Sequence, residues 1–268
     1  MNDFTKRFLD WNKRVSRSIA KIFPHTKYGN EYISALNLYY QMLGKYFGYM
    51  KTDKLSDSLP GKVVLDVGCG RTCGFQEEPF RKEAFVVAVD ISAEELSYNQ
   101  HADFKIQADI TREIPYPESV GRPEILCSAF VMEHLENNDS FIGLSAEVLA
   151  EGGYFIALLP NKFAPFSMIN QLLGHRTGSY ILRVLGKKTE GNGFKAYYDH
   201  TEPSAIRKLL EVHGYRVVEQ RLLYGSSDYF DFCFPAYFLS RFYECIVERL
   251  GVEALCSYFI VVAQKTGL

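Results

Sequence analysis

Short runs of branched apolar residues, bounded by turn residues, recur through the middle of the chain. Such runs are typical of buried parallel strands. They predict strands over residues 62–67, 85–89, 104–107, 125–129 and 154–159. Stretches with helical spacing fall between several of these runs, for example at 140–150. Strands that alternate with helices predict an α/β fold with a doubly wound, mostly parallel sheet.

The flanking regions have a different pattern. Apolar residues at steps of three and four predict a basic amphipathic helix over 2–23 and a second helix over 31–49. We therefore expect an N-terminal helical cap at 1–58 and a core at 59–268. Within the core, the strand pattern stops at 161–200, which we interpret as an insertion on the acceptor side.

The pattern resumes after the insertion. It predicts a helix over 203–213, capped by Thr201 and stopped by Gly214. Two more strands follow at 215–223 and 257–264, with a helix over 235–250 between them.

Composition and charge exclude several classes of protein. The net charge of −2 gives no basic excess of the kind that nucleic-acid binders show. The six cysteines form no CxxC pair, so we expect neither a zinc site nor a disulfide framework. No stretch reaches the length of a membrane span, and the N-terminus does not resemble a secretory signal. These features predict a cytoplasmic protein.

Three strand ends carry the candidate chemistry. The first predicted strand runs into Gly68-Cys69-Gly70, where glycines let the backbone approach a ligand. Asp90 ends the second strand, at a place where an acid can accept hydrogen bonds from ribose hydroxyls. Asp109 follows the third strand, where a carboxylate can accept a hydrogen bond from the amino group of adenine. Ile91 and Ile110 are placed to flank that ring.

These segments resemble the motifs of class I S-adenosylmethionine-dependent methyltransferases. LDVGCG, AVDIS and QADI are similar to the first three motifs, and CSAFVMEHL is similar to the fourth-strand motif of the small-molecule, quinone-biosynthesis branch. The resemblance implies a Rossmann-like, seven-stranded sheet with an antiparallel C-terminal hairpin. It also implies S-adenosylmethionine as cofactor and a small molecule as methyl acceptor. The cofactor residues that it implies are Asp66, Gly68, Cys69, Gly70, Arg71, Asp90, Ile91, Asp109, Ile110 and Ser128.

Two other functions stay open at this point. An NAD-dependent oxidoreductase would need a third glycine where Cys73 stands, and a non-catalytic S-adenosylmethionine-binding relative would keep the same motifs. The family often has a glycine near Thr72, so the loop can take another path here and Arg71 can meet the carboxylate of the ligand. Metal-dependent relatives carry an extra Glu where Phe130 stands, so no metal is expected.

The acceptor side is less determined by sequence. His134 and His200 are the candidate catalytic residues, because an imidazole can remove a hydroxyl proton near neutral pH. His134 can equally be a structural residue at a helix start, and Glu133 is expected to be solvated or in a first helical turn. Tyr197 to His200 either bind the acceptor or form a loop anchored by buried tyrosines.

The aromatic content and the insertion favour O-methylation of a bulky or partly apolar metabolite, glycan or lipid-linked intermediate. We expect the N-terminal helices, the insertion and the aromatic stretch near Phe230 to close the acceptor pocket, with Tyr28 or Tyr32 and Tyr197 or His200 nearest the sulfur. The aromatic stretch at 229–239 can also pack in the core, contact lipid or form a homodimer face. The basic N-terminal helix is expected to pack on its own domain, with peripheral membrane contact as the less favoured alternative.

Overall fold

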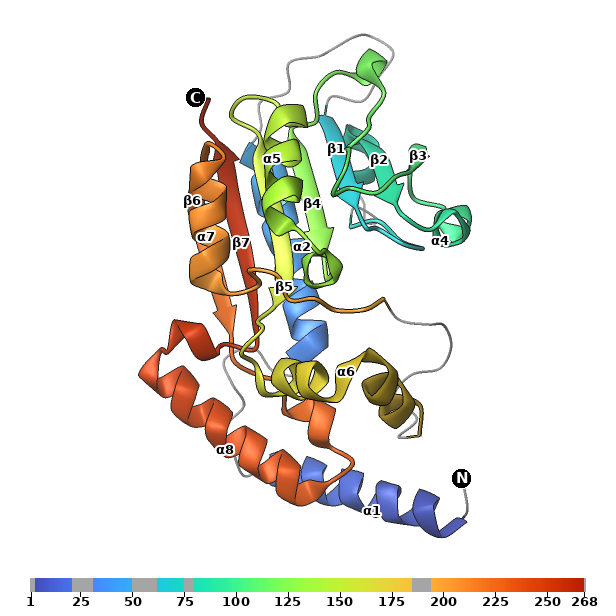
Figure 1. Cartoon of the computed structure of the whole chain (residues 1–268), viewed down its shortest axis with the longest axis vertical. Helices are drawn as coiled ribbons and strands as arrows, with labels where there is room; N and C mark the ends of the chain where they lie inside the picture. The colour runs from blue at the N-terminus through green and yellow to red at the C-terminus, as the bar shows by residue number, and fades with distance from the viewer. Residues whose placement is uncertain (1–2, 21–30, 50–61, 75–79, 185–193, 268) are drawn as a thin grey trace. The chain divides into compact units, whose positions relative to one another are not determined.

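The computed structural model describes residues 3–20, 31–49, 62–74, 80–184 and 194–267. Within them, seven strands form one sheet in the order β3-β2-β1-β4-β5-β7-β6 (Figure 1). The strands are β1 (Lys62–Val67), β2 (Ala84–Asp90), β3 (Phe104–Gln107), β4 (Ile125–Ala129), β5 (Tyr154–Pro160), β6 (Tyr215–Leu223) and β7 (Tyr258–Lys265). Each predicted strand is confirmed to within two residues at either end.

The first five strands are parallel. β1 pairs with both β2 and β4, β2 pairs with β3, and β4 pairs with β5. The chain order therefore reverses at β1, between β2 on one side and β4 on the other. Ligands of doubly wound folds bind at the carboxyl ends of the strands beside this reversal. The apolar runs are explained by burial, because β1 is covered on both faces.

The last strand runs against its neighbours. Lys265, at the end of β7, donates its N–H to Gly153 O (2.9 Å) and accepts from Gly152 N (3.0 Å), just before β5 begins. Ser257, just before β7, donates to Leu223 O (2.7 Å) at the end of β6. These three bonds place the start of one strand beside the end of its neighbour, so the expected antiparallel C-terminal ending is confirmed.

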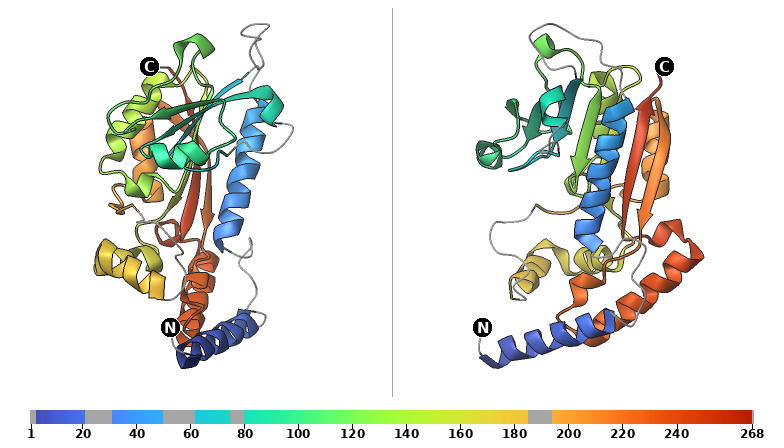
Figure 2. Two further views of the ribbon diagram at one scale, coloured as in Figure 1. Left: turned by 90° about the vertical axis from the view of Figure 1, so that its right-hand side faces the viewer. Right: turned by 180° about the vertical axis from the view of Figure 1, so that it is seen from behind.

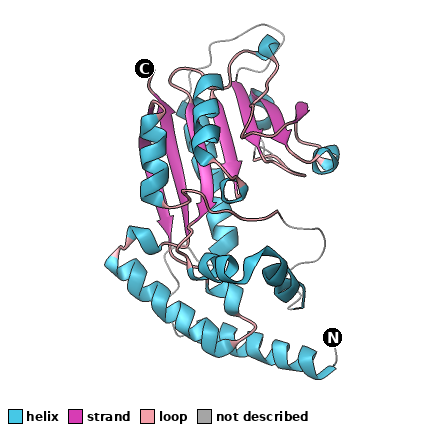
Figure 3. Cartoon of the chain, viewed as in Figure 1, coloured by secondary structure: helices cyan, strands magenta, loops and turns pink. Residues whose placement is uncertain are grey.

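Helices cover both faces of this sheet. Figures 1 and 2 show α5 and α7 on one face and α2 on the other, and Figure 3 separates helices from strands by colour. The longer helices are α1 (Asp3–Ala20), α2 (Glu31–Tyr49), α5 (Asn138–Val148), α6 (Pro165–Val184), α7 (Pro203–Val212) and α8 (Phe234–Leu250). The shorter ones are α3 (Phe80–Glu83), α4 (Ala93–Tyr98), η1 (Glu118–Val120), η2 (Met132–His134), η3 (Ser227–Phe230) and η4 (Glu253–Leu255). The helices expected from periodicity are confirmed.

Two local predictions are wrong. Glu202, not Thr201, is the N-cap of α7, and no side chain caps this helix end. The helix itself begins at Pro203 as expected, so the cap position falls on Glu202, and Thr201 is buried. Within the supposed patternless insertion lies α6, which the sequence pattern missed. Gly174, with φ 70° and ψ 162°, kinks this helix and interrupts its periodicity.

The chain divides into two compact units. One comprises Met1–Ala35, Pro160–Tyr197 and Leu222–Phe259, and the other comprises Leu36–Leu159, Tyr198–Arg221 and Ile260–Leu268. The second unit holds most of the sheet and the candidate site. The cap and core boundaries expected from sequence stay a prediction.

Candidate functional site

The turn after β1 is shaped by two glycines in the left-handed region. Gly68 (φ 66°) donates its N–H to Val89 O at 2.7 Å, which ties the turn to β2. A Cβ at Gly68 would lie 2.3 Å from Val131 Cγ2, so only glycine fits there. A Cβ at Gly70 (φ 54°) would meet no described atom within 4 Å. The backbone at Gly70 is thus open to a ligand.

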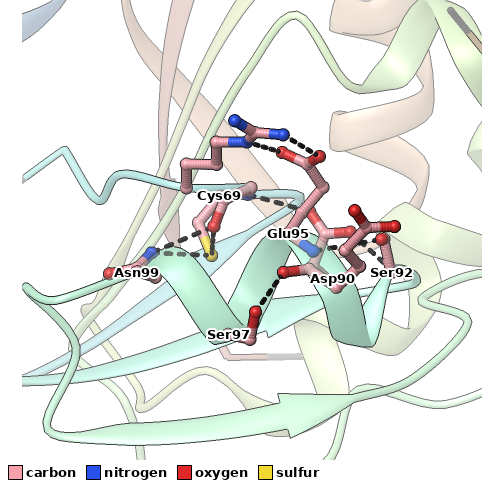
Figure 4. A network of polar contacts seen from close by, with 9 residues as sticks. Cys69, Asp90, Ser92, Glu95, Ser97 and Asn99 are labelled. Carbon is pink, nitrogen blue, oxygen red and sulfur yellow. Dashed lines mark hydrogen bonds and ion pairs between the residues drawn. The ribbon is translucent and has the colours of Figure 1, made fainter. Parts of the chain in front are cut away.

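Asp90 is held against this turn from the end of β2. Its Oδ2 accepts from Gly70 N (2.9 Å) and its Oδ1 from Ser92 N (2.8 Å). Ser92 also caps α4, where its Oγ accepts from Glu95 N (3.2 Å) (Figure 4). A carboxylate has about four acceptor positions, and these two bonds occupy two of them. Asp90 therefore has capacity for the paired hydroxyls of a ribose.

Asp66 closes the other side of the turn. Its Oδ2 accepts from Gly74 N at 2.6 Å, and burial raises the pKa of Asp66 to about 7. The bond joins the end of β1 to the far end of the glycine turn. In this structure Asp66 holds the turn in place, and its expected contact with a cofactor stays a prediction.

The side chains of the turn contact one another. Asn99 Nδ2 donates to Gly70 O (3.1 Å) and lies 3.6 Å from Cys69 Sγ (Figure 4). A hydrogen bond with Cys73, together with burial, raises the pKa of the Cys69 thiol, which keeps it protonated. A thiol that stays protonated is a poor nucleophile, and the expected contact of Cys69 with a cofactor stays a prediction.

Arg71, expected to meet the carboxylate of a ligand, pairs with Glu95 here. Its Nε and Nη2 donate to the two carboxylate oxygens of Glu95 at 2.8 and 3.0 Å. Its guanidinium also lies over the ring of Tyr98, 4.7 Å from the centroid. The bond from Arg71 lowers the pKa of Glu95. A ligand carboxylate would have to compete with this exposed pair.

The third strand end differs in exposure from the second. Asp109 Oδ1 accepts from Thr111 Oγ1 (2.7 Å) and Thr111 N (3.0 Å), and these bonds lower the pKa of Asp109. Its carboxylate is partly exposed and ionised. Of the two isoleucines expected to flank a ring, Ile91 is exposed and Ile110 is buried. Ile91 can present its side chain to a ligand, whereas Ile110 belongs to the core.

The end of β4 leads into strained backbone and buried polar groups. Ser128 is buried, and its Oγ has no hydrogen-bond partner in the described part of the chain. Phe130 follows with φ 57°, an uncommon conformation for a bulky residue, while its N–H donates to Leu158 O at 2.9 Å. Such conformations persist where surrounding bonds hold them, often at functional sites.

Glu133 lies in the first turn of η2, as one of the two expectations had it, and it is buried rather than solvated. Burial raises the pKa of Glu133 to about 8, which keeps the carboxyl largely neutral at pH 7. Its Oε2 has no hydrogen-bond partner among the described residues. Its Oε1 lies 3.8 Å from Nε2 of the half-buried His134. Tyr198 lies against Glu133, because it donates its N–H to Glu133 O (3.1 Å).

Asp199 and His200 form a close pair beside this loop. His200 Nδ1 lies 2.6 Å from Asp199 Oδ1. Asp199 is held in turn by Asn138, whose N–H donates to Asp199 Oδ2 (2.8 Å) and whose Nδ2 donates to Asp199 O (2.6 Å). Tyr198 and His200 have φ values of 56° and 52°. The two predicted histidines thus lie on segments that backbone bonds join directly.

Sequence reasoning missed one residue of this cluster. Asn138 links the loop after β4 to Asp199, and no sequence signal distinguishes it from an ordinary helix-start asparagine. Asp199 was among the residues expected near the acceptor, but its pairing with His200 was not predicted. Of the other residues expected near the acceptor, Tyr28 lies outside the described residues, and the side chain of Tyr32 is not described.

Known protein families match this chain over the strands that carry the candidate site. A family model described as a methyltransferase domain matches residues 65–157, from β1 to β5. The ubiquinone biosynthesis O-methyltransferase of Acinetobacter baylyi is 29% identical over 160 residues, which cover 58% of this chain and 63% of that protein. The chain therefore spans less than two thirds of the length of this curated relative.

Solved structures share the architecture at lower identity. An S-adenosylmethionine-dependent methyltransferase from Archaeoglobus fulgidus is 17% identical with a TM-score of 0.50, covering 86% of this chain and 94% of that chain. A phosphoethanolamine N-methyltransferase from Haemonchus contortus, solved with S-adenosyl-L-methionine, is 14% identical with a TM-score of 0.51. That match covers 90% of this chain and 55% of the other. At these identities the likeness establishes the fold.

Proposed function

We propose that the chain, whose residues 65–157 match a methyltransferase domain, is a class I S-adenosylmethionine-dependent methyltransferase that methylates a hydroxyl oxygen of a small, partly apolar acceptor. The observation that carries this proposal is the Asp199–His200 pair beside the end of β4. The O-methyltransferase name of the A. baylyi relative supports the same chemistry.

The glycine turn and the three strand ends fit an adenosyl cofactor. The open backbone at Gly70 leaves room for it, and Asp90 retains acceptor positions suited to ribose hydroxyls. We assign Asp109 to the adenine and Ile91 to a face of its ring. Bound there, S-adenosylmethionine supplies a methyl group that its own positive charge has already activated. The protein therefore has to align the acceptor and exclude water.

We assign His200 as the general base. Asp199 accepts the Nδ1 proton of His200, which fixes the tautomer and leaves Nε2 as the proton acceptor. The histidine side chain is half exposed, so an acceptor can reach Nε2. A hydroxyl bound beside it would transfer its proton to Nε2 as the oxygen becomes nucleophilic.

His134 is the second candidate base, beside a largely neutral carboxyl. The Glu133 carboxyl can donate a hydrogen bond when protonated, so the pair suits the binding of an acceptor oxygen better than proton removal. We therefore assign His134 and Glu133 to positioning of the acceptor. That the N-terminal helices, the insertion and the aromatic stretch close the acceptor site stays a prediction.

Paired substitutions test these assignments. Methyl transfer to a catechol, with and without an attached alkyl chain, would be followed with labelled S-adenosylmethionine. His200→Gln is expected to lower kcat by about 10²- to 10⁴-fold, the usual contribution of a general base. His134→Gln is expected to raise KM with a smaller effect on kcat.

Calorimetry supplies the control and the opposing outcome. Both variants should bind S-adenosylhomocysteine as the wild type does, which separates acceptor chemistry from cofactor binding. Loss of catalysis in His134→Gln alone would assign the base to His134. Tight binding of NAD with no binding of either adenosyl ligand would overturn the proposed function.

A further inference from the structure

The compact unit formed by residues 1–35, 160–197 and 222–259 exposes large apolar side chains on its helices. The clearest case is α8, where Leu239, Phe242, Ile246 and Leu250 are all exposed, Leu239 by 65% and Leu250 by 70%. These residues follow one another at steps of three and four, so they form one stripe along the helix. An apolar stripe of this length on a surface helix marks a binding surface.

The N-terminal helix contacts α8 through both polar and aromatic side chains, since Trp11 also lies edge-on to Phe234 with ring centroids 5.7 Å apart. Asn12 Oδ1 accepts from Phe234 N (3.0 Å), and Ser16 Oγ donates to Asp231 O (3.2 Å), so polar side chains join α1 to the start of α8. Phe8 and Trp11 are each 52% exposed. α1 therefore contacts α8 within the same compact unit, while about half of each of these two aromatic side chains stays exposed. Figure 2 shows α1 and the start of α8 side by side.

The third helix of the unit repeats this exposure. Leu172 in α6 is 85% exposed, and Met168, Ile169 and Leu173 are exposed as well. Phe166, at the start of α6, stacks on Tyr229 of η3 with ring centroids 4.5 Å apart, which anchors α6 to the segment before α8. We call α1, α6 and α8 the interfacial helices.

Charge decides what covers these apolar surfaces. The sequence of α1 contains five lysines or arginines and two aspartates, and Lys6, Arg7 and Arg14 are exposed; that of α8 contains two arginines and two glutamates. A second copy of the chain that paired through α1 would bring two basic surfaces together. An anionic lipid surface complements the charge and takes up the apolar side chains, with tryptophan at the interface where it is favoured.

We propose that the interfacial helices bind the surface of a bilayer that contains anionic phospholipid, lying in its plane. No described helix is long and apolar enough to cross a membrane. The arrangement is that of a protein that lies on the membrane, with aromatic and leucine side chains at the acyl boundary and lysines and arginines at the headgroups. This inference does not require the proposed hydroxyl methylation.

Vesicle binding by the full chain is the direct test. The protein would be sedimented with vesicles of phosphatidylcholine alone and with vesicles that also contain phosphatidylglycerol, at low and high salt. We expect binding to the anionic vesicles, at least tenfold weaker binding to the neutral ones, and weaker binding at high salt.

Two double variants address the two parts of the surface. Lys6→Gln with Arg14→Gln removes two exposed basic residues of α1 and should weaken anionic binding about 25-fold, at about fivefold per residue. Leu239→Gln with Phe242→Gln should weaken it about tenfold or more by removing apolar insertion.

Matched controls come from α7, in the other compact unit. Lys208→Gln and Val212→Gln alter an exposed lysine and a 73% exposed valine, and neither should change vesicle binding. Every variant should keep the wild-type unfolding midpoint, since all the altered side chains are exposed.

Three outcomes would overturn the proposal. They are no binding to anionic vesicles, binding that neither double variant weakens, and binding that the α7 controls weaken equally. A fourth outcome against the proposal would come from light scattering. A wild-type dimer that Leu239→Gln with Phe242→Gln dissociates, without vesicle binding, would assign the stripe to a second copy of the chain.

Discussion

Replacing Glu133 by glutamine should make the protein less sensitive to high pH. The carboxyl has an ordinary pKa of 4.5, which burial raises to about 8 in the folded chain. As the pH rises above 4.5, the unfolded state releases this proton while the folded state keeps it. The free energy of unfolding contributed by Glu133 therefore falls between about pH 4.5 and pH 8, and then levels off.

The size of this effect follows from the two pKa values. Each pKa unit corresponds to about 1.4 kcal/mol, so the full rise corresponds to about 5 kcal/mol. Relaxation and entry of water reduce such costs in proteins. We therefore expect about 3–5 kcal/mol above pH 8. The amide of Glu133→Gln fills a similar volume and has no proton to lose in this range.

Urea unfolding at pH 5 and at pH 9 measures this difference. Wild type and Glu133→Gln should be similarly stable at pH 5, and the variant should be the more stable at pH 9. All other titrations occur in both proteins and cancel in the comparison. Glu136→Gln, an exposed acid three residues further along, is the matched control and should follow the wild type. Parallel pH profiles for wild type and Glu133→Gln would refute the burial argument.

Three further predictions concern the cofactor turn and the metal. Asp90→Ala should weaken S-adenosylmethionine binding by about 1.5–3 kcal/mol in calorimetry, because it removes a charged hydrogen-bond partner; unchanged affinity would remove Asp90 from the ribose site. Gly68→Ala should lower the melting temperature strongly, since its Cβ would overlap Val131, whereas Gly70→Ala should mainly weaken the cofactor; equal melting temperatures would contradict the role of Val131. Activity in EDTA should equal that without it, because Phe130 stands where a ligand carboxylate would be needed; rescue by magnesium would refute this.

The strands and the cofactor turn could be predicted because their signals are local. A buried parallel strand reads as a continuous apolar run, and a glycine turn must follow it within a few residues. The position of Asp90 followed from the same rule, and it lies 2.9 Å from Gly70 N as a residue of the same strand edge should. The need for glycine at position 68 was not readable in this way. It depends on Val131, which lies on another strand's loop.

The acceptor side was predicted less well because its geometry is set by contacts distant in sequence. Glu133 looks solvated in sequence, since an acid before a histidine at a helix start is ordinary surface chemistry. It is buried in the folded chain, where Tyr198, sixty-five residues later, donates its N–H to the carbonyl of Glu133. Asn138 lies sixty-one residues before Asp199, so only the folded chain shows the bonds that hold Asp199 beside His200.

Strained backbone in the loop after β4 and at residues 198–200 gives a physical reason to connect these two segments with function. Phe130, Tyr198 and His200 are the non-glycine residues with positive φ in the described part of the chain. Each such conformation costs about 1–3 kcal/mol and persists only when its surroundings impose it. The bonds from Phe130 N to Leu158, from Tyr198 N to Glu133 and from Asn138 to Asp199 impose it here. An exposed imidazole would otherwise sample several orientations, and its alignment with an acceptor would be lost. Backbone bonds to a buried strand end, together with the carboxylate of Asp199, fix His200 in one orientation before any acceptor binds.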